Sequence, residues 1–182
     1  MGGLIIVGAA GSGKDTLVGW IRDDFGVTPI GFADPIRVFL RLLLGPGKHR
    51  AAAQAIGDAV RAADPLAFVR LAQRRAHRSR RFVITDARLP QELAAFGDAL
   101  RIGLDAPADL RAQRLAIRDG AAYQPLAHAT ETQVPALLAQ CQVRLVNDGP
   151  DLASFRRLYN TQLYPILVTH FGKARLAFPS PA

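Results

Sequence analysis

A glycine-rich segment that ends in a lysine lies near the start of the chain: GAAGSGKDT, at residues 8–16. It follows a short apolar run at residues 4–7, so the expected order is a buried strand, a glycine loop and a helix. In such a unit the backbone N–H groups of the loop converge on phosphate oxygens, and the helix N-terminus adds partial positive charge. Lys14 would reach the β- and γ-phosphates of a nucleotide. The segment therefore predicts a phosphate-binding loop.

Asp15 occupies the position where Ser or Thr usually ligates Mg²⁺ in such loops, and Thr16 follows it. A carboxylate in the first turn of a helix is favourable by itself, because it complements the positive end of the helix dipole. The other interpretation is that Asp15 faces a phosphoryl acceptor or a metal-bound water. The local pattern leaves both interpretations open.

Two further polar residues stand at the ends of predicted strands. Asp86 ends an apolar run at residues 81–86, and Asn147 follows another at residues 143–146. Parallel α/β sheets bind ligands beyond the carboxyl ends of their strands, so both residues are expected to share one cleft with the glycine loop. Asp86 is the best candidate for a Mg²⁺ contact, made through water because Mg²⁺ keeps several waters. The alternative is that Asp86 caps the turn after the strand.

Three arginines on separate segments could supply the fixed cations that phosphoryl transfer needs. Arg37, Arg61 and Arg88 follow the second predicted strand, the second predicted helix and the third predicted strand. Each could bind an acceptor phosphate through a bidentate contact. The alternative for each is an ordinary surface charge.

A second group of arginines has helical spacing. Arg111, Arg114 and Arg118 stand at i, i+3 and i+7, which places them on one face of a helix. A row of like charges repels itself unless anions lie nearby, and such a row suits a lid that closes over phosphates. Surface charge, or a salt bridge of Arg118 with a nearby Asp, is the alternative.

Alternating strands and helices are expected to position these side chains. Strands are predicted at residues 4–7, 28–32, 81–86, 100–104 and 143–146. Helices are predicted at residues 14–25, from 34 to the glycines at 45–47, at 49–63, from 65 to 76, from 90, at 107–118, after 130–133 and from 151. Pro165 is expected to end or kink the last helix. The alternation predicts an α/β fold: a mainly parallel five-stranded sheet in the three-layer arrangement of P-loop nucleotide-binding proteins.

Length and composition are those of a single globular domain. The 182 residues are 49% hydrophobic and 21% charged, and no apolar run approaches the ~18 residues of a membrane span. The one cysteine, Cys141, excludes an internal disulfide, and a cytoplasmic location is expected. The scattered histidines lack the spacing of a zinc site. The net charge of +8 comes mostly from arginine, and its densest cluster is interpreted as a solvated helix end rather than a nucleic-acid surface: Arg74, Arg75, Arg78, Arg80 and Arg81.

Five segments besides the glycine loop carry a family resemblance. They are FADPIR (32–37), IGDAVRAADPLAFVR (56–70), VITDARLPQE (83–92), HATET (128–132) and VNDG (146–149). In this order and over most of the chain, they resemble the phage-type deoxynucleoside monophosphate kinases, P-loop relatives of adenylate kinase. The resemblance implies transfer of the γ-phosphoryl of Mg·ATP to a deoxynucleoside 5′-monophosphate.

The resemblance also implies roles for individual residues. Asp15 would face the acceptor, which favours the second interpretation above, and Thr16 and Asp86 would serve the metal. ATP would be held by Gly11, Ser12, Gly13, Lys14 and Thr16, with Asn147 and Asp148 near its adenine. The acceptor would be bound by Asp15, Ile36, Arg37, Arg61, Arg88 and Arg111. Lys14, Asp15, Arg114 and Arg118 would act in the transfer. Residues 34–64 would form the monophosphate-binding segment and residues 107–130 the lid.

Two other functions stay open at this level. One is a different small-molecule kinase of the same fold, such as dephospho-coenzyme A kinase, whose hydroxyl acceptor would need a positioned base. The other is a nucleotide- or nucleic-acid-binding protein without kinase activity. The accepted base, the preference for deoxyribose and the oligomeric state, a homodimer included, are not determined by the sequence.

Overall fold

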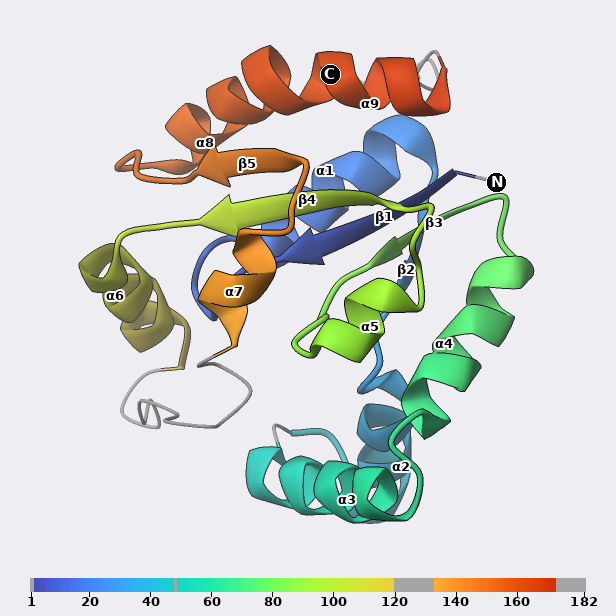
Figure 1. Cartoon of the computed structure of the whole chain (residues 1–182). Helices are drawn as coiled ribbons and strands as arrows, with labels where there is room; N and C mark the ends of the chain where they lie inside the picture. Colours follow the sequence, from blue (N-terminus) through green and yellow to red (C-terminus); the bar gives the residue numbers. More distant parts are fainter. Residues whose placement is uncertain (1, 48, 120–132, 173–182) are drawn as a thin grey trace, which may run out of the picture.

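A parallel five-stranded sheet forms the centre of the computed structural model, which describes residues 2–47, 49–119 and 133–172. The strands are β1 (Gly2–Val7), β2 (Thr28–Ile30), β3 (Arg81–Ile84), β4 (Leu100–Asp105) and β5 (Val143–Val146). Their spatial order is β2-β3-β1-β4-β5, and every neighbouring pair is parallel. The predicted α/β class and strand number are confirmed, and β1 lies in the middle of the sheet (Figure 1).

Because the strands are parallel, their carboxyl ends meet at one edge of the sheet. Ile5 of β1 pairs with Ile84 of β3, and Val7 pairs with Gly103 of β4. The loops that follow β1, β3 and β4 therefore leave the sheet side by side, at the arrowheads in Figure 1. This register brings the glycine loop next to the segment that carries Asp86.

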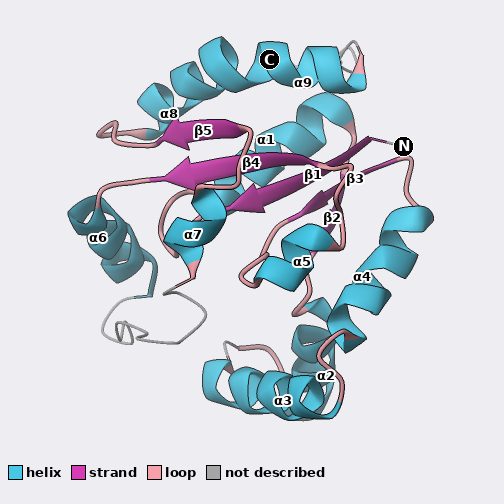
Figure 2. Cartoon of the chain, viewed as in Figure 1, coloured by secondary structure: helices cyan, strands magenta, loops and turns pink. Residues whose placement is uncertain are grey.

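Helices connect the strands and cover the sheet (Figure 2). They are α1 (Lys14–Phe25), α2 (Asp34–Leu44), α3 (Arg50–Ala63), α4 (Ala67–His77), α5 (Pro90–Ala94), α6 (Ala108–Asp119), α7 (Val134–Leu138), α8 (Leu152–Leu158) and α9 (Tyr164–Phe171). Most bounds lie within two residues of those predicted, and α1 has the predicted bounds. The capping box expected at 130–133 and residues 120–130 of the expected lid fall mainly outside the described residues.

Alternate residues of β1 build a core on each face of the sheet, which gives the three layers. Ile5 and Val7 pack in one cluster with side chains of α4, α5 and α7. Leu4 and Ile6 pack in the other with α1 and the C-terminal helices. All four side chains are fully buried, as expected for a central strand with both faces covered. Below the sheet in Figure 1, α2 and α3 extend away from it as a separate pair.

The C-terminal helix differs from its expected form. The helix continues past Pro165. A π-helical turn, η2 (Tyr159–Leu163), joins α8 to α9, and Pro165 lies in the first turn of α9. Proline lacks the N–H that an α-helix needs at this position, and widening the preceding turn accommodates it. Tyr159 is fully buried there, and its hydroxyl donates to Asp24 Oδ2 of α1 at 2.7 Å. The turn thus ties the end of the chain to the helix that follows the glycine loop.

In the described ranges, no helix is long and apolar enough to cross a membrane.

Candidate active site

Glycines shape the loop between β1 and α1 for three separate reasons. Gly11 and Gly13 have φ angles of 80° and 102°, a region in which only glycine is unstrained. Gly8 is required by packing, because a Cβ there would lie 2.3 Å from the carbonyl oxygen of Leu104 in β4. A Cβ at Gly11 would also approach the backbone of Arg111 to 2.7 Å. The loop is therefore seated against β4 and α6, which fixes its course.

Lys14 folds back over this loop. Its Nζ donates to the carbonyl oxygens of Gly8 at 2.7 Å and Ala9 at 2.8 Å. Burial lowers the pKa of Lys14 to about 8; the nearby charges of Arg88 and Arg111 also lower it, while Asp15 and Asp86 act in the opposite direction. An ammonium has three donors, so one N–H is left for a ligand. A cation held so far below its ordinary pKa is stabilised by any anion that binds beside it.

Asn147 joins the glycine loop to the end of β5. Its side chain is buried, and Nδ2 donates to the carbonyl oxygen of Ser12 at 2.9 Å. Its backbone N–H donates to Asp105 O at 2.8 Å. The N–H of Ser12 donates within the loop to Ala9 O, and its hydroxyl is buried. Asn147 therefore positions the loop, whereas Asp148 beside it is exposed.

We expect Asn147→Ala to lower the free energy of unfolding by about 1–3 kcal/mol, since it leaves a buried carbonyl without its donor. Chemical denaturation measures this value. Asp148→Ala is the matched control, because an exposed neighbour is expected to change stability by no more than about 0.5 kcal/mol. Equal effects of the two substitutions would contradict the positioning role of Asn147.

Asp86 lies where the sequence predicted it, after β3 and close enough to Lys14 to raise its pKa. Its Oδ1 accepts the N–H of Phe32 at 2.7 Å, and its Oδ2 accepts that of Ala33 at 3.3 Å. Arg37 Nη2 lies 3.3 Å from the same Oδ2. Asp86 thus holds the turn between β2 and α2, a role that differs from the expected alternative of capping the turn after its own strand. Oδ1 keeps a second lone pair, whereas Oδ2 accepts from both Ala33 and Arg37, so water-mediated contact with a cation through Oδ1 is compatible with this geometry.

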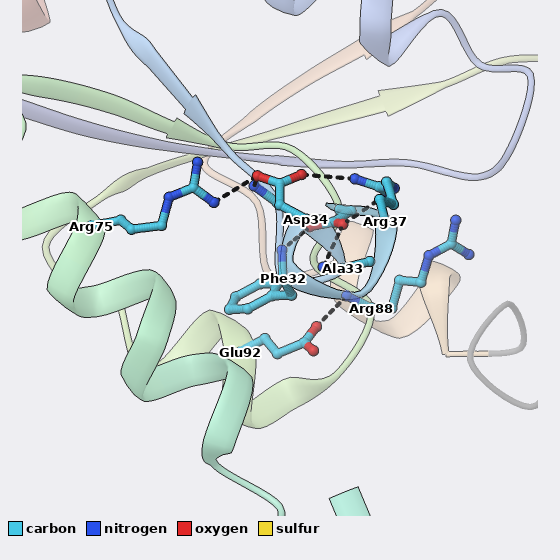
Figure 3. A network of polar contacts seen from close by, with 9 residues as sticks. Phe32, Ala33, Asp34, Arg37, Arg75, Arg88 and Glu92 are labelled. Atoms are coloured by element: carbon cyan, nitrogen blue, oxygen red, sulfur yellow. Dashed lines mark hydrogen bonds and ion pairs between the residues drawn. The ribbon is translucent and has the colours of Figure 1, made fainter. Parts of the chain in front are cut away.

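Asp34 organises the start of α2 (Figure 3). Its carboxylate lies between Arg37 Nη1 at 2.9 Å and Arg75 Nη1 of α4 at 2.7 Å, and it accepts the N–H of Gly31 at 2.8 Å. Arg75 belongs to the cluster predicted to form a mostly solvated face; its side chain is 40% exposed and also forms this ion pair with α2. Its partner stands 41 positions earlier in the chain, so no local spacing indicated the pair.

Glu92 fixes the loop that carries Arg88. It is buried, and its Oε2 accepts the backbone N–H of Arg88 at 2.7 Å and of Leu89 at 3.0 Å. Burial raises the pKa of Glu92, and these hydrogen bonds oppose the shift. The side chain of Arg88 extends away from Glu92 (Figure 3). Burial has the opposite effect on the basic side chain of Arg88 and lowers its pKa, while the negative charges of Asp86 and Glu92 partly offset this shift.

Ile36 and Arg61 meet where α2 and α3 pack together. Ile36 is buried, and a Cβ added at Gly57 would lie 3.4 Å from its Cδ1 and 3.0 Å from Arg61 Nη2. Arg61 pairs with Asp58 at 2.7 Å and lies 5.9 Å from the ring centre of Phe68. Its charge reaches Glu92, whose pKa it lowers. The structure therefore places Ile36 and Arg61 together beside Gly57, and the charge of Arg61 near Glu92.

Arg111 and Arg114 of α6 contact backbone carbonyls of the loops that follow β4 and β5. Arg111 Nε donates to Ala106 O at 3.1 Å. Arg114 donates to the carbonyl oxygens of Asn147 at 3.2 Å and Gly149 at 3.2 Å. Arg118, near the end of α6, is exposed. The shared helical face thus leads from the glycine loop to the β5–α8 connection.

Asp15 and Thr16 lie in the first turn of α1, directly after Lys14. Asp15 is exposed and Thr16 is half-buried. Asp15 is close enough to Lys14 to raise its pKa. Both interpretations of Asp15 are compatible with this place.

Sequence reasoning missed the contacts of several positioning groups: Asp34, Arg75, Glu92 and the carbonyl of Leu104. The order L-P-Q-E at residues 89–92 holds the one usable signal, a glutamate three residues after a helix start, which predicts that it accepts the N–H of the cap residue. The other contacts join segments far apart in the chain. They follow only from the strand order.

No family model and no curated protein sequence matches the chain. Among solved structures, TT1252 from Thermus thermophilus superposes with a TM-score of 0.54 at 19% identity, over 92% of this chain and 97% of that one. Shikimate kinase from Bacteroides thetaiotaomicron superposes with a TM-score of 0.52 at 15% identity, over 87% and 97%. The chain therefore has the three-layer α/β fold of the P-loop kinases.

Proposed function

We propose that the protein is a kinase that transfers the γ-phosphoryl group of Mg·ATP to a deoxynucleoside 5′-monophosphate. One observation carries the proposal: Lys14 is surrounded by arginines from separate segments, with Arg88 and Arg111 each lowering its pKa. Arg37 extends this charge, since it lowers the pKa of Arg88. Cations that lower one another's pKa values repel one another. A ligand that supplies several negative charges stabilises their charged forms, as a donor and an acceptor phosphate together do.

The residues divide between two phosphates. The loop at residues 8–16 and Lys14 would bind the donor, with Arg114 and Asn147 holding the connection beside its base. Arg37, Arg61 and Arg88 would bind and orient the acceptor phosphate from α2, α3 and the loop after β3. Asp86 and Glu92 hold two of these segments in place through backbone N–H groups. Orientation and charge neutralisation are the main contributions that phosphoryl transfer requires of a protein.

Mg²⁺ is the metal that the site fits. Asp86 offers one free lone pair on Oδ1, Thr16 offers a hydroxyl, and Mg²⁺ accepts such oxygen donors while keeping several waters. When bound, the ion would neutralise charge on the transferred phosphoryl group. Asp86 would hold it through water, because its carboxylate is already engaged with Phe32, Ala33 and Arg37.

A phosphate acceptor suits the site better than a hydroxyl acceptor. An acceptor phosphate is already anionic and needs no strong base, whereas a hydroxyl needs one. The carboxylates of Asp34 and Asp86 are both engaged by arginine and by backbone N–H groups, which leaves them poorly placed to accept a proton from a substrate. Of the described histidines, His77 and His170 line a cavity at the other end of the sheet, and His49 lies beside Gly45.

The test is ADP release with Mg·ATP and a panel of acceptors: deoxynucleoside and nucleoside monophosphates, dephospho-coenzyme A and shikimate. We expect turnover with at least one deoxynucleoside monophosphate. Arg61→Gln is expected to raise the KM for this acceptor about tenfold or more, and to leave the KM for ATP within about twofold, because it removes a charged contact to one substrate only.

Arg22→Gln is the control, since Arg22 is exposed and pairs with its neighbour Asp23. Turnover with a hydroxyl acceptor alone would overturn the proposed substrate class. Binding of ATP without turnover of any acceptor would overturn the proposal that the protein is a kinase.

A further inference from the structure

A cavity of about 430 Å³ opens at the amino ends of the strands, away from the glycine loop. The lining residues come from the start of β1, the end of α4, the turn before β3 and the end of α9. They are Gly2, His77, Arg78, Ser79, Arg80, Arg81, His170 and Phe171. Three arginines and two histidines thus face one space, and this lining contains no Asp or Glu. The site described above does not use any of them.

One of these arginines holds the walls of the cavity together. Arg81 donates through Nη1 to Phe25 O at 3.0 Å and through Nη2 to Phe171 O at 2.6 Å. Its guanidinium also lies 5.2 Å from the ring centre of Phe171. His170 Nε2 lies 3.2 Å from Gly3 O. These contacts join α1, β1, β3 and α9, so the cavity has fixed walls.

The other two arginines are exposed and uncompensated. In the part of the chain that the structure describes, the guanidinium groups of Arg78 and Arg80 form no hydrogen bond or ion pair. Two other arginines of α4 contrast with them: Arg70 pairs with Asp64, and Arg75 pairs with Asp34. A cleft lined by one sign of charge focuses its field and attracts the opposite charge.

The helix dipole explains only part of this charge. Cations are favoured at the carboxyl end of a helix, which accounts for basic residues in the last turn of α4. It does not account for Arg80, which lies in the turn beyond the helix, or for Arg81, which starts β3. The arginines beyond α4 therefore face this space for a reason other than the stability of α4.

We propose that this cavity binds a phosphate-bearing small molecule, at a site separate from the glycine loop. Arginine forks match the geometry of phosphate oxygens, and the volume falls within the range of about 300–1,000 Å³ that small-molecule sites occupy. Gly2 and Val7 stand at opposite ends of β1, about 16 Å apart at ~3.3 Å per residue, so one phosphate group cannot contact both sites. The inference does not depend on the proposed kinase activity.

Calorimetric titration with inorganic tripolyphosphate at about 0.1 M salt tests the proposal. We expect two classes of binding in the wild type. Arg78→Gln and Arg80→Gln are each expected to weaken one class by about tenfold or more, because each removes a charged hydrogen bond. Lys14→Ala should weaken the other class. If the glycine loop does not bind phosphates, the class that depends on Arg78 and Arg80 is still observed.

Arg74→Gln is the matched control, since Arg74 is an exposed arginine near the end of α4, shortly before Arg78 and Arg80, and does not line the cavity. Equal weakening in all three variants, or no class that depends on Arg78 and Arg80, would overturn the site. A short DNA duplex forms a separate arm of the experiment. Binding of DNA with a steep salt dependence, weakened equally in the three variants, would indicate a diffuse basic surface and also overturn the proposal.

Discussion

Lys14→Ala is expected to reduce kcat/KM by at least about 10²-fold, which corresponds to roughly 2.7 kcal/mol of transition-state stabilisation. One N–H of Lys14 is left for a ligand, and the ammonium lies near Arg88, Arg111 and Asp86. Removing it takes away the cation nearest the loop carbonyls of Gly8 and Ala9. Steady-state ADP release with Mg·ATP and the best acceptor of the panel measures the effect. Near-normal activity would refute the assigned role.

The same substitution is expected to increase the stability of the unliganded protein at pH 7. The folded state lowers the pKa of Lys14 from 10.5 to about 8, so the unfolded state binds more protons between these values and the stability of the wild type rises with pH there. Below about pH 8 the folded protein carries the full cost of this buried charge. The gain in Lys14→Ala should therefore be largest at pH 7 and shrink toward pH 10. Loss of both activity and stability would instead indicate damage to the loop.

The parts of the fold that depend on local pattern were predictable from the sequence. The glycine loop sits between β1 and α1 as expected, and α1 and β5 have the predicted bounds. The strand β2 is shorter than expected, ending at Ile30, because the N–H groups of Phe32 and Ala33 turn to Asp86 instead of continuing the ladder. The local pattern of apolar residues does not indicate that the side chain of Asp86 competes with the neighbouring strand for these N–H groups.

The site was predictable as a set of residues but not as a set of contacts. The carboxyl ends of parallel strands converge, so Lys14, Asp86 and Asn147 could be placed at one edge. Which groups they contact depends on pairs such as Asn147 with Ser12, 135 positions apart. Asp34 with Arg75 is a second such pair. The spacing of Arg111 and Arg114 predicted a shared face, but not that Arg114 would hold the carbonyls of Asn147 and Gly149.

Gly8→Ala is expected to have the second large effect. Its Cβ would lie 2.3 Å from the carbonyl oxygen of Leu104 and 2.9 Å from Ser12 Oγ, so the loop or β4 must move. Overpacking of this kind costs about 1–3 kcal/mol of stability. A displacement of about 1 Å in a positioned group can cost on the order of 10²-fold in rate. Denaturation and kcat/KM measured on the same variant report the two effects, and both are expected to fall.

Gly19→Ala is the matched control because Gly19 lies inside α1, where an added Cβ meets no atom within 4 Å. Alanine is favoured over glycine in a helix interior by about 0.5–1 kcal/mol, so this variant should be more stable and equally active. Comparison of Gly8→Ala with Gly19→Ala separates the effect of replacing a glycine from the effect of the steric clash with β4. If Gly8→Ala behaved like Gly19→Ala, the loop would not be seated against Leu104, and the position of Lys14 over its carbonyls would need another cause.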